Sequence, residues 1–301
     1  MTFLTFILVS FLLLSSCGDT AQYPLGSKEN PIKFLFTPSV ESTSLVKNSA
    51  ELIRYLEKNT KLVFKTSVPT NYITVIESFG SNRADIAILN SFGYLLAHSK
   101  YGATAEAIVI RNNTHFYWGQ IIAHRDSGIT KIEDIQGKNV AYTDPSSLSG
   151  YLFPKLLLDE KKIVPKRIVF GMKHDIVVTM VYQRQVDAGA TFYTAPNGSV
   201  IRDARANVLT QFPDVEDKVK IVRLTQKIPN DPVVFRENIP RDVIEKIVTA
   251  IISFSRTEDG KRVLKSMYGI DGITIATDSA FDNLRHVINS SDIELGDVLK
   301  K

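Results

Sequence analysis

The chain of 301 residues contains a single cysteine, Cys17, so no disulfide can form within it. It also lacks a concentrated basic stripe, because its net charge is only +4 and no Lys/Arg cluster occurs. The sequence therefore gives no indication of nucleic-acid binding. Its prominent apolar run, FLTFILVSFLLL at residues 3–14, is shorter than the roughly 20 residues that span a bilayer. Repeats and low-complexity segments are also missing, and the overall composition is that of a globular protein.

What the N-terminus does contain is typical of secretion. An apolar run of this length is typical of a signal-peptide core, although no Lys or Arg precedes it. LSSCG follows directly, and a leucine, two small residues and a cysteine resemble the lipobox of bacterial lipoproteins. The resemblance implies cleavage before Cys17 and acylation of its sulfur and amine. We expect a signal peptide at 1–16, a polar tether at 17–30, and an extracytoplasmic protein (periplasm or cell surface) held on a membrane by lipid at Cys17.

After the tether, strand-like apolar runs alternate with amphipathic helical stretches. IKFLFT (32–37) precedes a helix predicted over about 43–58, and ADIAIL precedes one over about 91–99. YWGQIIAH, KNVAYT, RIVF and VDAGAT continue the pattern, and the tail from about 240 is predicted to be mainly helical. The alternation predicts an α/β fold with a mostly parallel sheet. We expect lobe 1 at 31–118 and 225–301, with lobe 2 inserted at 119–224.

The segment DPSSLSGYLFPK, from residue 144, crowds serines and a glycine at the start of a predicted helix. Pro154 fits the first helical turn, so the helix is expected to start near 149–151, with Ser147 and Ser149 at its mouth. Such a start can hold an anion without a cationic side chain, because its N–H groups are unpaired and its dipole is positive. Gly150 would let a ligand approach the backbone. The alternatives are an ordinary helix cap and a nucleophilic serine.

The nucleophile is the weaker alternative. The chain has no G-x-S-x-G elbow, and no base for Ser147 is evident. His174 and Asp187 could complete a triad with it only on paper, because any chain of this length offers such residues. A serine hydrolase therefore ranks behind a binding protein.

The same segment resembles the DP-x-S-T-S-G-[YF]-x-x-P motif of periplasmic phosphonate-, phosphite- and phosphate-binding proteins of ABC importers. Further ordered segments match that family: VPTNYITVIESFGSNRADIAIL, YWGQIIAHRDSGITKIEDIQGKNVAY, IVFGMKHDIVV, VDAGA and IPNDPVVF. The resemblance covers nearly all of residues 30–270. It implies a type II periplasmic binding protein, two α/β lobes with a ligand cleft between them, served by an ABC permease and its ATPase.

The resemblance also implies the site. It places the phosphonyl group on Ser147 and Ser149, with backbone N–H groups through Gly150. Family tyrosines that hydrogen-bond ligand oxygens correspond to Tyr72 and Tyr117, and the family histidine corresponds to His174. No cofactor and no metal are implied.

Two departures bear on the ligand. Leu148 stands where the family motif has threonine, so one hydroxyl is missing. Binders of aminoalkylphosphonates in the family use a glutamate and an aspartate for the ligand amine; Asp231 keeps the aspartate, but Thr194 replaces the glutamate. We therefore expect a small phosphorus oxyanion among neutral donors (phosphonate, phosphite or phosphate) rather than 2-aminoethylphosphonate. The alternative is a protein of the same fold that binds or senses an unrelated small solute.

Overall fold

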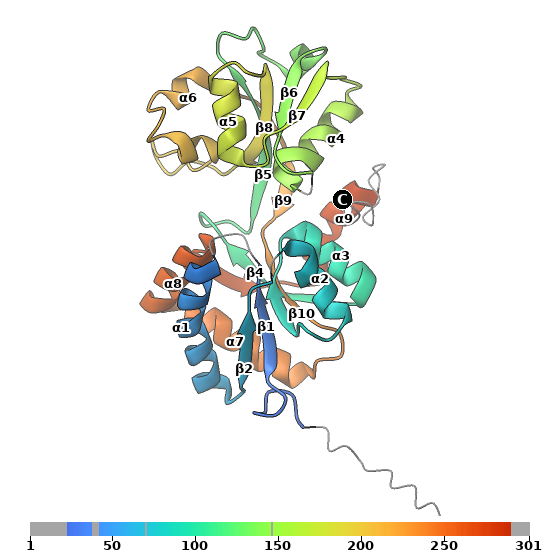
Figure 1. Cartoon of the computed structure of the whole chain (residues 1–301), viewed down its shortest axis with the longest axis vertical. Coiled ribbons are helices and arrows are strands. Elements are labelled where there is room, and N and C mark those ends of the chain that lie inside the picture. The colour runs from blue at the N-terminus through green and yellow to red at the C-terminus, as the bar shows by residue number, and fades with distance from the viewer. Residues whose placement is uncertain (1–22, 38–41, 70, 146, 290–301) are drawn as a thin grey trace, which may run out of the picture.

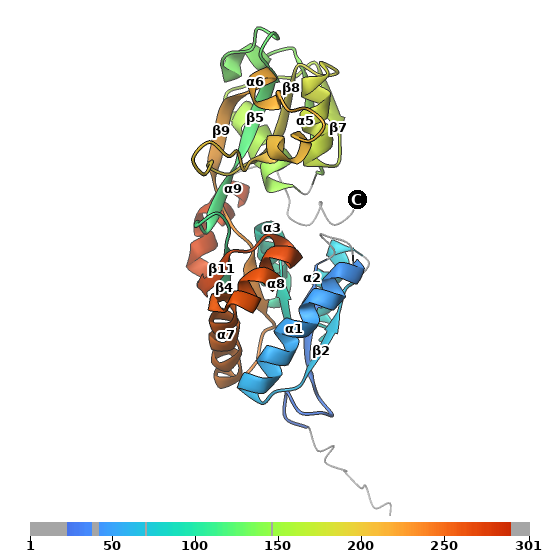
Figure 2. The same cartoon turned by 90° about the vertical axis from the view of Figure 1, so that its left-hand side faces the viewer.

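The computed structural model describes residues 23–37, 42–69, 71–145 and 147–289. Two α/β lobes follow each other along the long axis of the molecule, and the strands β5 and β9 run between them (Figures 1 and 2). Each lobe is built on its own sheet, with the strand order β11-β4-β10-β3-β1-β2 in lobe 1 and β7-β6-β8-β5-β9 in lobe 2. The two-lobed α/β fold predicted from the sequence is confirmed.

Lobe 1 places helices on both faces of its sheet. Phe34 and Phe36 of β1 point into one core with α1, α7 and α8, while Leu35 points into the other with α2, α3 and α9. The rings of Phe34 and Phe36 stack at 4.7 Å and are fully buried, which stabilises the lobe by about 1.5–3 kcal/mol per side chain. The elements are β1 (Ile32–Phe36), α1 (Ser42–Thr60), β2 (Phe64–Ser67), α2 (Tyr72–Gly80), β3 (Ile86–Ile88), α3 (Ser91–Tyr101), β4 (Thr104–Ile110), β10 (Pro232–Phe235), α7 (Arg241–Arg256), α8 (Glu258–Tyr268), β11 (Gly272–Ile275), η4 (Asp278–Phe281) and α9 (Asp282–Asn289).

Lobe 2 repeats this layering on a smaller scale. Ile121 of β5 packs with α4 on one face of the sheet, and its neighbour Ile122 packs with α5 on the other. The elements are β5 (Phe116–His124), η1 (Ile132–Ile135), β6 (Asn139–Tyr142), the π-helical turn η2 (Leu148–Leu152), α4 (Phe153–Glu160), β7 (Arg167–Phe170), α5 (His174–Tyr182), β8 (Ala188–Tyr193), η3 (Ala204–Val208), α6 (Val215–Lys218) and β9 (Val219–Pro229).

The expectation of a mostly parallel sheet is wrong, because both sheets are mixed. In the described strands β1 pairs in parallel with β2 and β3, and β6 with β7 and β8. The pairs β10–β3, β10–β4, β11–β4, β5–β8 and β5–β9 are antiparallel. The chain leaves lobe 1 after β4 and returns through β9, so its return strand β10 runs against its neighbours. Hydrophobic alternation shows which face of a strand is buried but not the direction of the strand.

The tail after residue 240 also departs from the expectation in one place. It contains α7, α8 and α9, as predicted, but also β11, which pairs antiparallel with β4. β11 has only four residues, and its last, Ile275, is 71% exposed. A strand this short shows too little alternation to be recognised.

The proposed lobe boundaries near 118 and 224 fall within β5 and β9, which pair antiparallel from Phe116 opposite Pro229 to His124 opposite Val219. These two crossing strands connect the sheets. None of the helices in the described part of the chain is long and apolar enough to cross a membrane.

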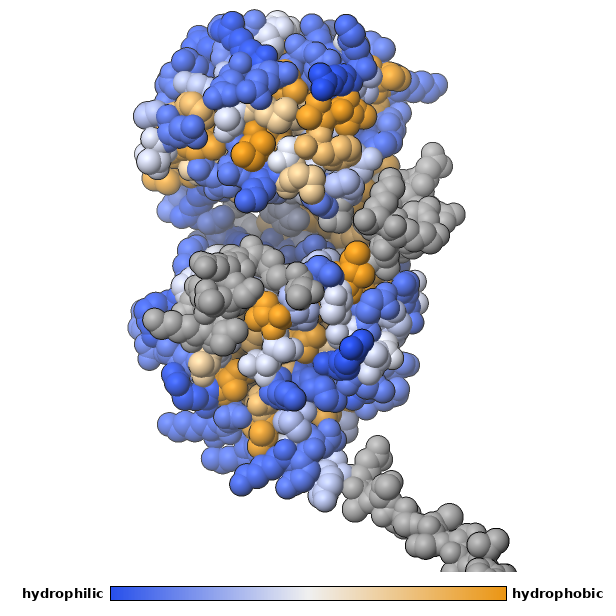
Figure 3. Space-filling model, in the orientation of Figure 1, coloured by the Kyte–Doolittle hydropathy of each residue, from blue (hydrophilic) through white to orange (hydrophobic). Residues whose placement is uncertain are grey.

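Exposed hydrophobic side chains gather on lobe 2. Ile168 and Phe170 of β7, Met172 of the following turn and Ile176 of α5 are all more than 40% exposed. Figure 3 shows hydrophobic surface over this part of lobe 2, away from the waist between the lobes. None of these four residues lines the cleft described below.

Candidate functional site

A cleft of about 310 Å³ lies between the lobes. Lobe 1 and its turn into β5 contribute Asn90, Arg111, Asn112, Asn230 and Asp231; β5 contributes Phe116 and Tyr117; lobe 2 contributes Ser147, Leu148, Ser149, His174, Phe192, Thr194 and Arg202. Of the eight ligand-binding residues expected from the sequence, six therefore line one cleft. Tyr72 and Gly150 do not line it.

The hydroxyl-rich segment forms a capped helix start. Ser147 has an extended backbone (φ −76°, ψ 119°), and its Oγ accepts a hydrogen bond from the Gly150 N–H at 3.0 Å. A hydroxyl that accepts in this way can still donate its own hydrogen to a ligand oxygen. The N–H of Gly150 donates to Ser147, whereas the N–H groups of Leu148 and Ser149 have no acceptor among the described residues. Ser147 can therefore cap the helix and also donate a hydrogen bond to an anion.

Gly150 is required by packing against the strand beneath it. A Cβ at this position would lie 1.9 Å from Oγ1 of Thr143, which follows β6, and the Thr143 N–H donates to the Gly150 carbonyl at 3.0 Å. The structure thus gives this glycine a different reason from the ligand approach that the sequence suggested. The helix start can sit on the end of β6 only because residue 150 has no side chain.

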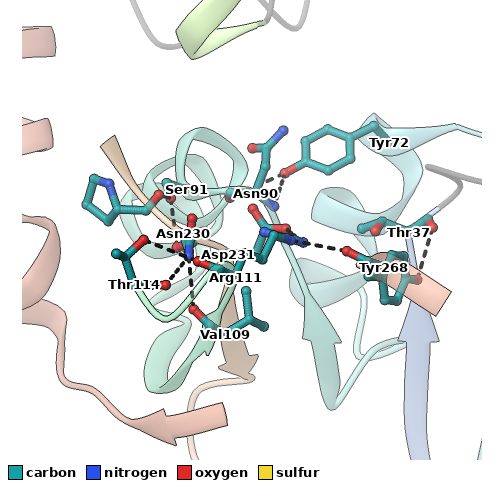
Figure 4. A network of polar contacts seen from close by, with 11 residues as sticks. Thr37, Tyr72, Asn90, Ser91, Val109, Arg111, Thr114, Asn230, Asp231 and Tyr268 are labelled. Carbon is teal, nitrogen blue, oxygen red and sulfur yellow. Dashed lines mark hydrogen bonds and ion pairs between the residues drawn. The ribbon is translucent and has the colours of Figure 1, made fainter. Parts of the chain in front are cut away.

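The two tyrosines take different positions. Tyr117 lines the cleft; burial and then the charge of Asp231 raise its pKa, against opposing effects of Arg111 and Ser149, so it stays a neutral donor. The Tyr72 hydroxyl accepts from the Asn90 N–H at 3.0 Å and donates to the Asn90 carbonyl at 3.4 Å (Figure 4). Burial, followed by Asp231, raises its pKa well above the usual value. In this structure Tyr72 therefore holds Asn90, which is itself in the cleft lining.

His174 begins α5 and stands edge-on to Phe192, with the ring centroids 4.9 Å apart. Burial lowers its pKa to about 4, with Asp175 opposing, so the imidazole is neutral at pH 7. Its Nδ1 is buried and has no hydrogen-bond partner among the described residues. Because unpaired buried polar atoms are rare, this nitrogen points to a ligand that would complete its hydrogen bonding.

The hydrolase arrangement is not formed. Asp187 accepts a hydrogen bond from the Asn139 N–H at 2.7 Å, at the start of β6. It therefore supports the sheet of lobe 2 rather than His174, whose Nδ1 has no partner in the described structure.

Arg111 is a cleft residue that the sequence analysis missed. Its guanidinium forms an ion pair with Asp231 at 2.7 Å and donates from Nε to the Tyr268 carbonyl at 3.1 Å (Figure 4). The expectation of neutral donors only is thus wrong, since a cation lies in the cleft. Asp231, expected as the remaining carboxylate for a ligand amine, is already paired. No other carboxylate lines the cleft among the described residues.

The turn that begins at Arg111 could have been predicted from its own residues. Asn112 and Asn113 both have positive φ (53° and 61°), and Arg111 and Thr114 exchange backbone hydrogen bonds at 2.9 and 3.1 Å. This is the geometry of a two-residue type I′ turn, which asparagine tolerates. The Asn-Asn pair could have predicted the turn. The pair could not have shown that Asp231 forms an ion pair with Arg111.

The other cleft residues that the sequence did not predict are Phe116, Phe192, three asparagines and Arg202. The Asn230 amide donates to the carbonyls of Val109 (3.2 Å) and Thr114 (2.9 Å), which ties the returning chain to the crossing. Figure 4 shows these bonds converging on Asn230 beside Asp231. Arg202 donates from Nη1 to Oδ1 of Asn112 at 3.0 Å, across from lobe 2.

The cleft is electrostatically suited to an anion. Residues at the starts of three helical segments line it: Asn90 caps α3, Ser147 caps the turn that continues into α4, and His174 begins α5. Helix N-termini carry partial positive charge and unpaired N–H groups. Among the described residues, no cluster of His, Cys, Asp or Glu could hold a metal ion. The arrangement can therefore bind a small anion directly through hydrogen bonds and helix dipoles.

Comparison with known proteins agrees with this geometry. The family model of ABC-transporter phosphonate periplasmic substrate-binding proteins matches residues 34–281. The phosphonates-binding periplasmic protein of Escherichia coli is 23% identical over 80% of this chain and 71% of its own. The phosphate-import protein PhnD of Mycolicibacterium smegmatis is 22% identical over 94% of each chain. The structure of PhnD1 from Prochlorococcus marinus in complex with methylphosphonate has a TM-score of 0.66 at 15% identity, covering 86% of this chain and 97% of that one.

Proposed function

The chain belongs to the family of ABC-transporter phosphonate periplasmic substrate-binding proteins, and we propose that it is a lipid-anchored receptor that delivers a small phosphorus oxyanion to a permease and its ATPase. The family places the protein outside the cytoplasm and gives it the type II binding-protein fold. The relatives are binding components of transporters, which supports reversible capture rather than catalysis.

The observation that carries the proposal is the meeting of three helix N-termini in one cleft with a neutral histidine whose Nδ1 has no hydrogen-bond partner among the described residues. A tetrahedral oxyanion has several acceptor oxygens, which can accept hydrogen bonds from the hydroxyls of Ser147, Ser149 and Tyr117 and from backbone N–H groups of the helix start. The named relatives bind phosphonates and import phosphate, so phosphonate, phosphite and phosphate are the ligands to test.

Calorimetry with methylphosphonate, phosphite and phosphate tests the proposal, and a neutral sugar serves as the comparison. We expect reversible binding of at least one oxyanion without turnover. Hydrolysis of a phosphonate or phosphate ester would instead support an enzyme. If none of the three oxyanions binds, the result would support a protein of the same fold that binds an unrelated solute.

Closure of the two lobes should be visible through the only tryptophan. Trp118 lies edge-on to Phe116, which lines the cleft (centroids 5.1 Å), and to Tyr193 at the end of β8 (5.7 Å), but does not itself line the cleft. Alternation along β5 places it opposite its neighbour Tyr117. Saturating oxyanion should therefore shift Trp118 emission as the crossing strands bend. Trp118→Phe should abolish the signal while keeping affinity within a few-fold. Unchanged emission together with unchanged small-angle scattering would contradict closure.

The lipid anchor rests on the LSSCG motif, since Cys17 lies outside the described residues. Cys17→Ser should release the protein from membranes or leave the precursor uncleaved. Membrane fractionation and the intact mass of the purified protein measure both effects. A wild-type protein that fractionates without membranes and begins upstream of Cys17 would refute the anchor.

A further inference from the structure

A second cavity adjoins the cleft. Its volume is about 660 Å³, and it is lined by Asn112, Asn113, Arg202, Lys261, Lys265 and Asp271. Asn112 and Arg202 line both the cleft and this cavity, so the two cavities are neighbours that meet at these residues. We call this second cavity the basic annex. Three of the residues that line it are cationic, and one is acidic.

The acidic residue of the basic annex is already engaged. Asp271 pairs with Lys265 at 2.7 Å and accepts a hydrogen bond from the Asn112 N–H at 2.6 Å. Burial raises its pKa, but the Lys265 and Asn112 hydrogen bonds and the nearby charges of Lys265 and Arg202 lower it overall. Asp271 is therefore a carboxylate in an environment that is cationic overall. It holds the Asn112 turn in place and offsets the charge of Lys265.

Arg202 is the cation with capacity to bind. Its guanidinium donates to the Asn112 amide oxygen, and the described residues include no carboxylate in an ion pair with it. Its backbone is fixed next to Asp203, which is 2% exposed and pairs with Arg205 at 2.8 Å. The Gln120 amide donates to the same carboxylate at 3.3 Å. This buried network holds the loop that carries Arg202 at the junction of cleft and annex.

Arg111, the other arginine of the cleft, differs from Arg202 because its charge is neutralised by the ion pair with Asp231. Among the described residues that line the cleft, Arg202 is the guanidinium without a carboxylate partner. A ligand extended toward the basic annex would meet Arg202 and then Lys261 and Lys265. These lysines pair with Glu258 and Asp271, each at 2.7 Å, but their side chains are 53% and 57% exposed. Planar guanidinium groups bind carboxylate and phosphate strongly.

We propose that the basic annex binds a second anionic group of the ligand, so that the preferred ligand is a phosphonate or phosphate monoester with a carboxylate or phosphoryl group at its far end. The inference rests on the proposed function and refines its substrate class.

Calorimetry with matched probes tests the inference. Propylphosphonate carries a neutral end, 3-phosphonopropionate a carboxylate, and propane-1,3-diphosphonate a phosphoryl group. We expect the two bifunctional probes to bind at least about tenfold more tightly than propylphosphonate, as one charge-assisted hydrogen bond allows. Which of the two binds better distinguishes the carboxylate from the phosphoryl group. The preference should shrink at high salt.

Arg202→Gln should reduce that preference about tenfold, and Lys261→Gln should reduce it less, because Lys261 also pairs with Glu258 at 2.7 Å. The matched control is Arg167→Gln on the exposed edge strand β7, which loses the same charge away from both cavities and should keep the preference. Circular dichroism verifies that each variant is folded.

The outcomes separate the inference from the proposed function. Equal binding of all three probes contradicts the inference that the basic annex binds a second anionic group. So does a preference that survives both Arg202→Gln and Lys261→Gln. Neither result contradicts the proposed function as an oxyanion receptor. If neither these probes nor methylphosphonate, phosphite and phosphate bind, the proposed function fails and the inference fails with it.

Discussion

Gly150→Ala is expected to lower affinity for the oxyanion about a hundredfold or more and to destabilise the fold by about 1–3 kcal/mol. The added Cβ would lie 1.9 Å from Oγ1 of Thr143, so either β6 or the helix start must move. Because Ser147 and Ser149 belong to that start, both of their ligand hydrogen bonds would be disturbed together. Calorimetry and urea unfolding measure the two effects.

Two companion variants make this prediction specific. Thr143→Ala in the Gly150→Ala background should restore part of both losses, because it removes Oγ1 and Cγ2 but leaves Cβ, 2.8 Å from the new methyl. Gly272→Ala is the control, since a Cβ there would only come within 3.7 Å of Ile110, an ordinary contact. Wild-type affinity in Gly150→Ala would show that the anion is held elsewhere.

Ser147→Ala is expected to weaken oxyanion binding about ten- to a hundredfold, since a hydrogen bond to a charged group contributes roughly 1.5–3 kcal/mol. It should also cost about 1 kcal/mol of stability through loss of the cap on Gly150. The two effects need to be separated, because a weakened fold could lower apparent affinity.

The variant Thr257→Ala separates the loss of stability from the loss of affinity. Thr257 caps α8 in the same manner, accepting from the Gly260 N–H at 2.9 Å, and it does not line the cleft. It should therefore lose a similar amount of stability in urea unfolding with unchanged affinity by calorimetry. Equal affinity losses in both variants would mean that Ser147 acts only as a cap.

Much of the fold was determined by local sequence. The alternation of Phe34, Leu35 and Phe36 already assigned opposite faces to β1, and α1 and α3 formed where periodicity predicted them. The helix start was predicted to within about two residues, near 149–151 against the observed cap at Ser147, because capping depends on residues within four positions of one another. Of the eight site residues expected from the family motifs in this chain, six line one cleft.

What only the tertiary structure decided depends on strand direction and on contacts between distant residues. Pairing of β4 with β10 brings Arg111 to Asp231, 120 residues later, and so neutralises the acid that the sequence left free for an amine. The meeting of Arg202 with Asn112, and of a glycine with Thr143, likewise depends on how separate elements pack. Hydrophobic periodicity records which side of an element is buried, but not which distant element covers it, and the charge of the cleft is set by those long-range neighbours.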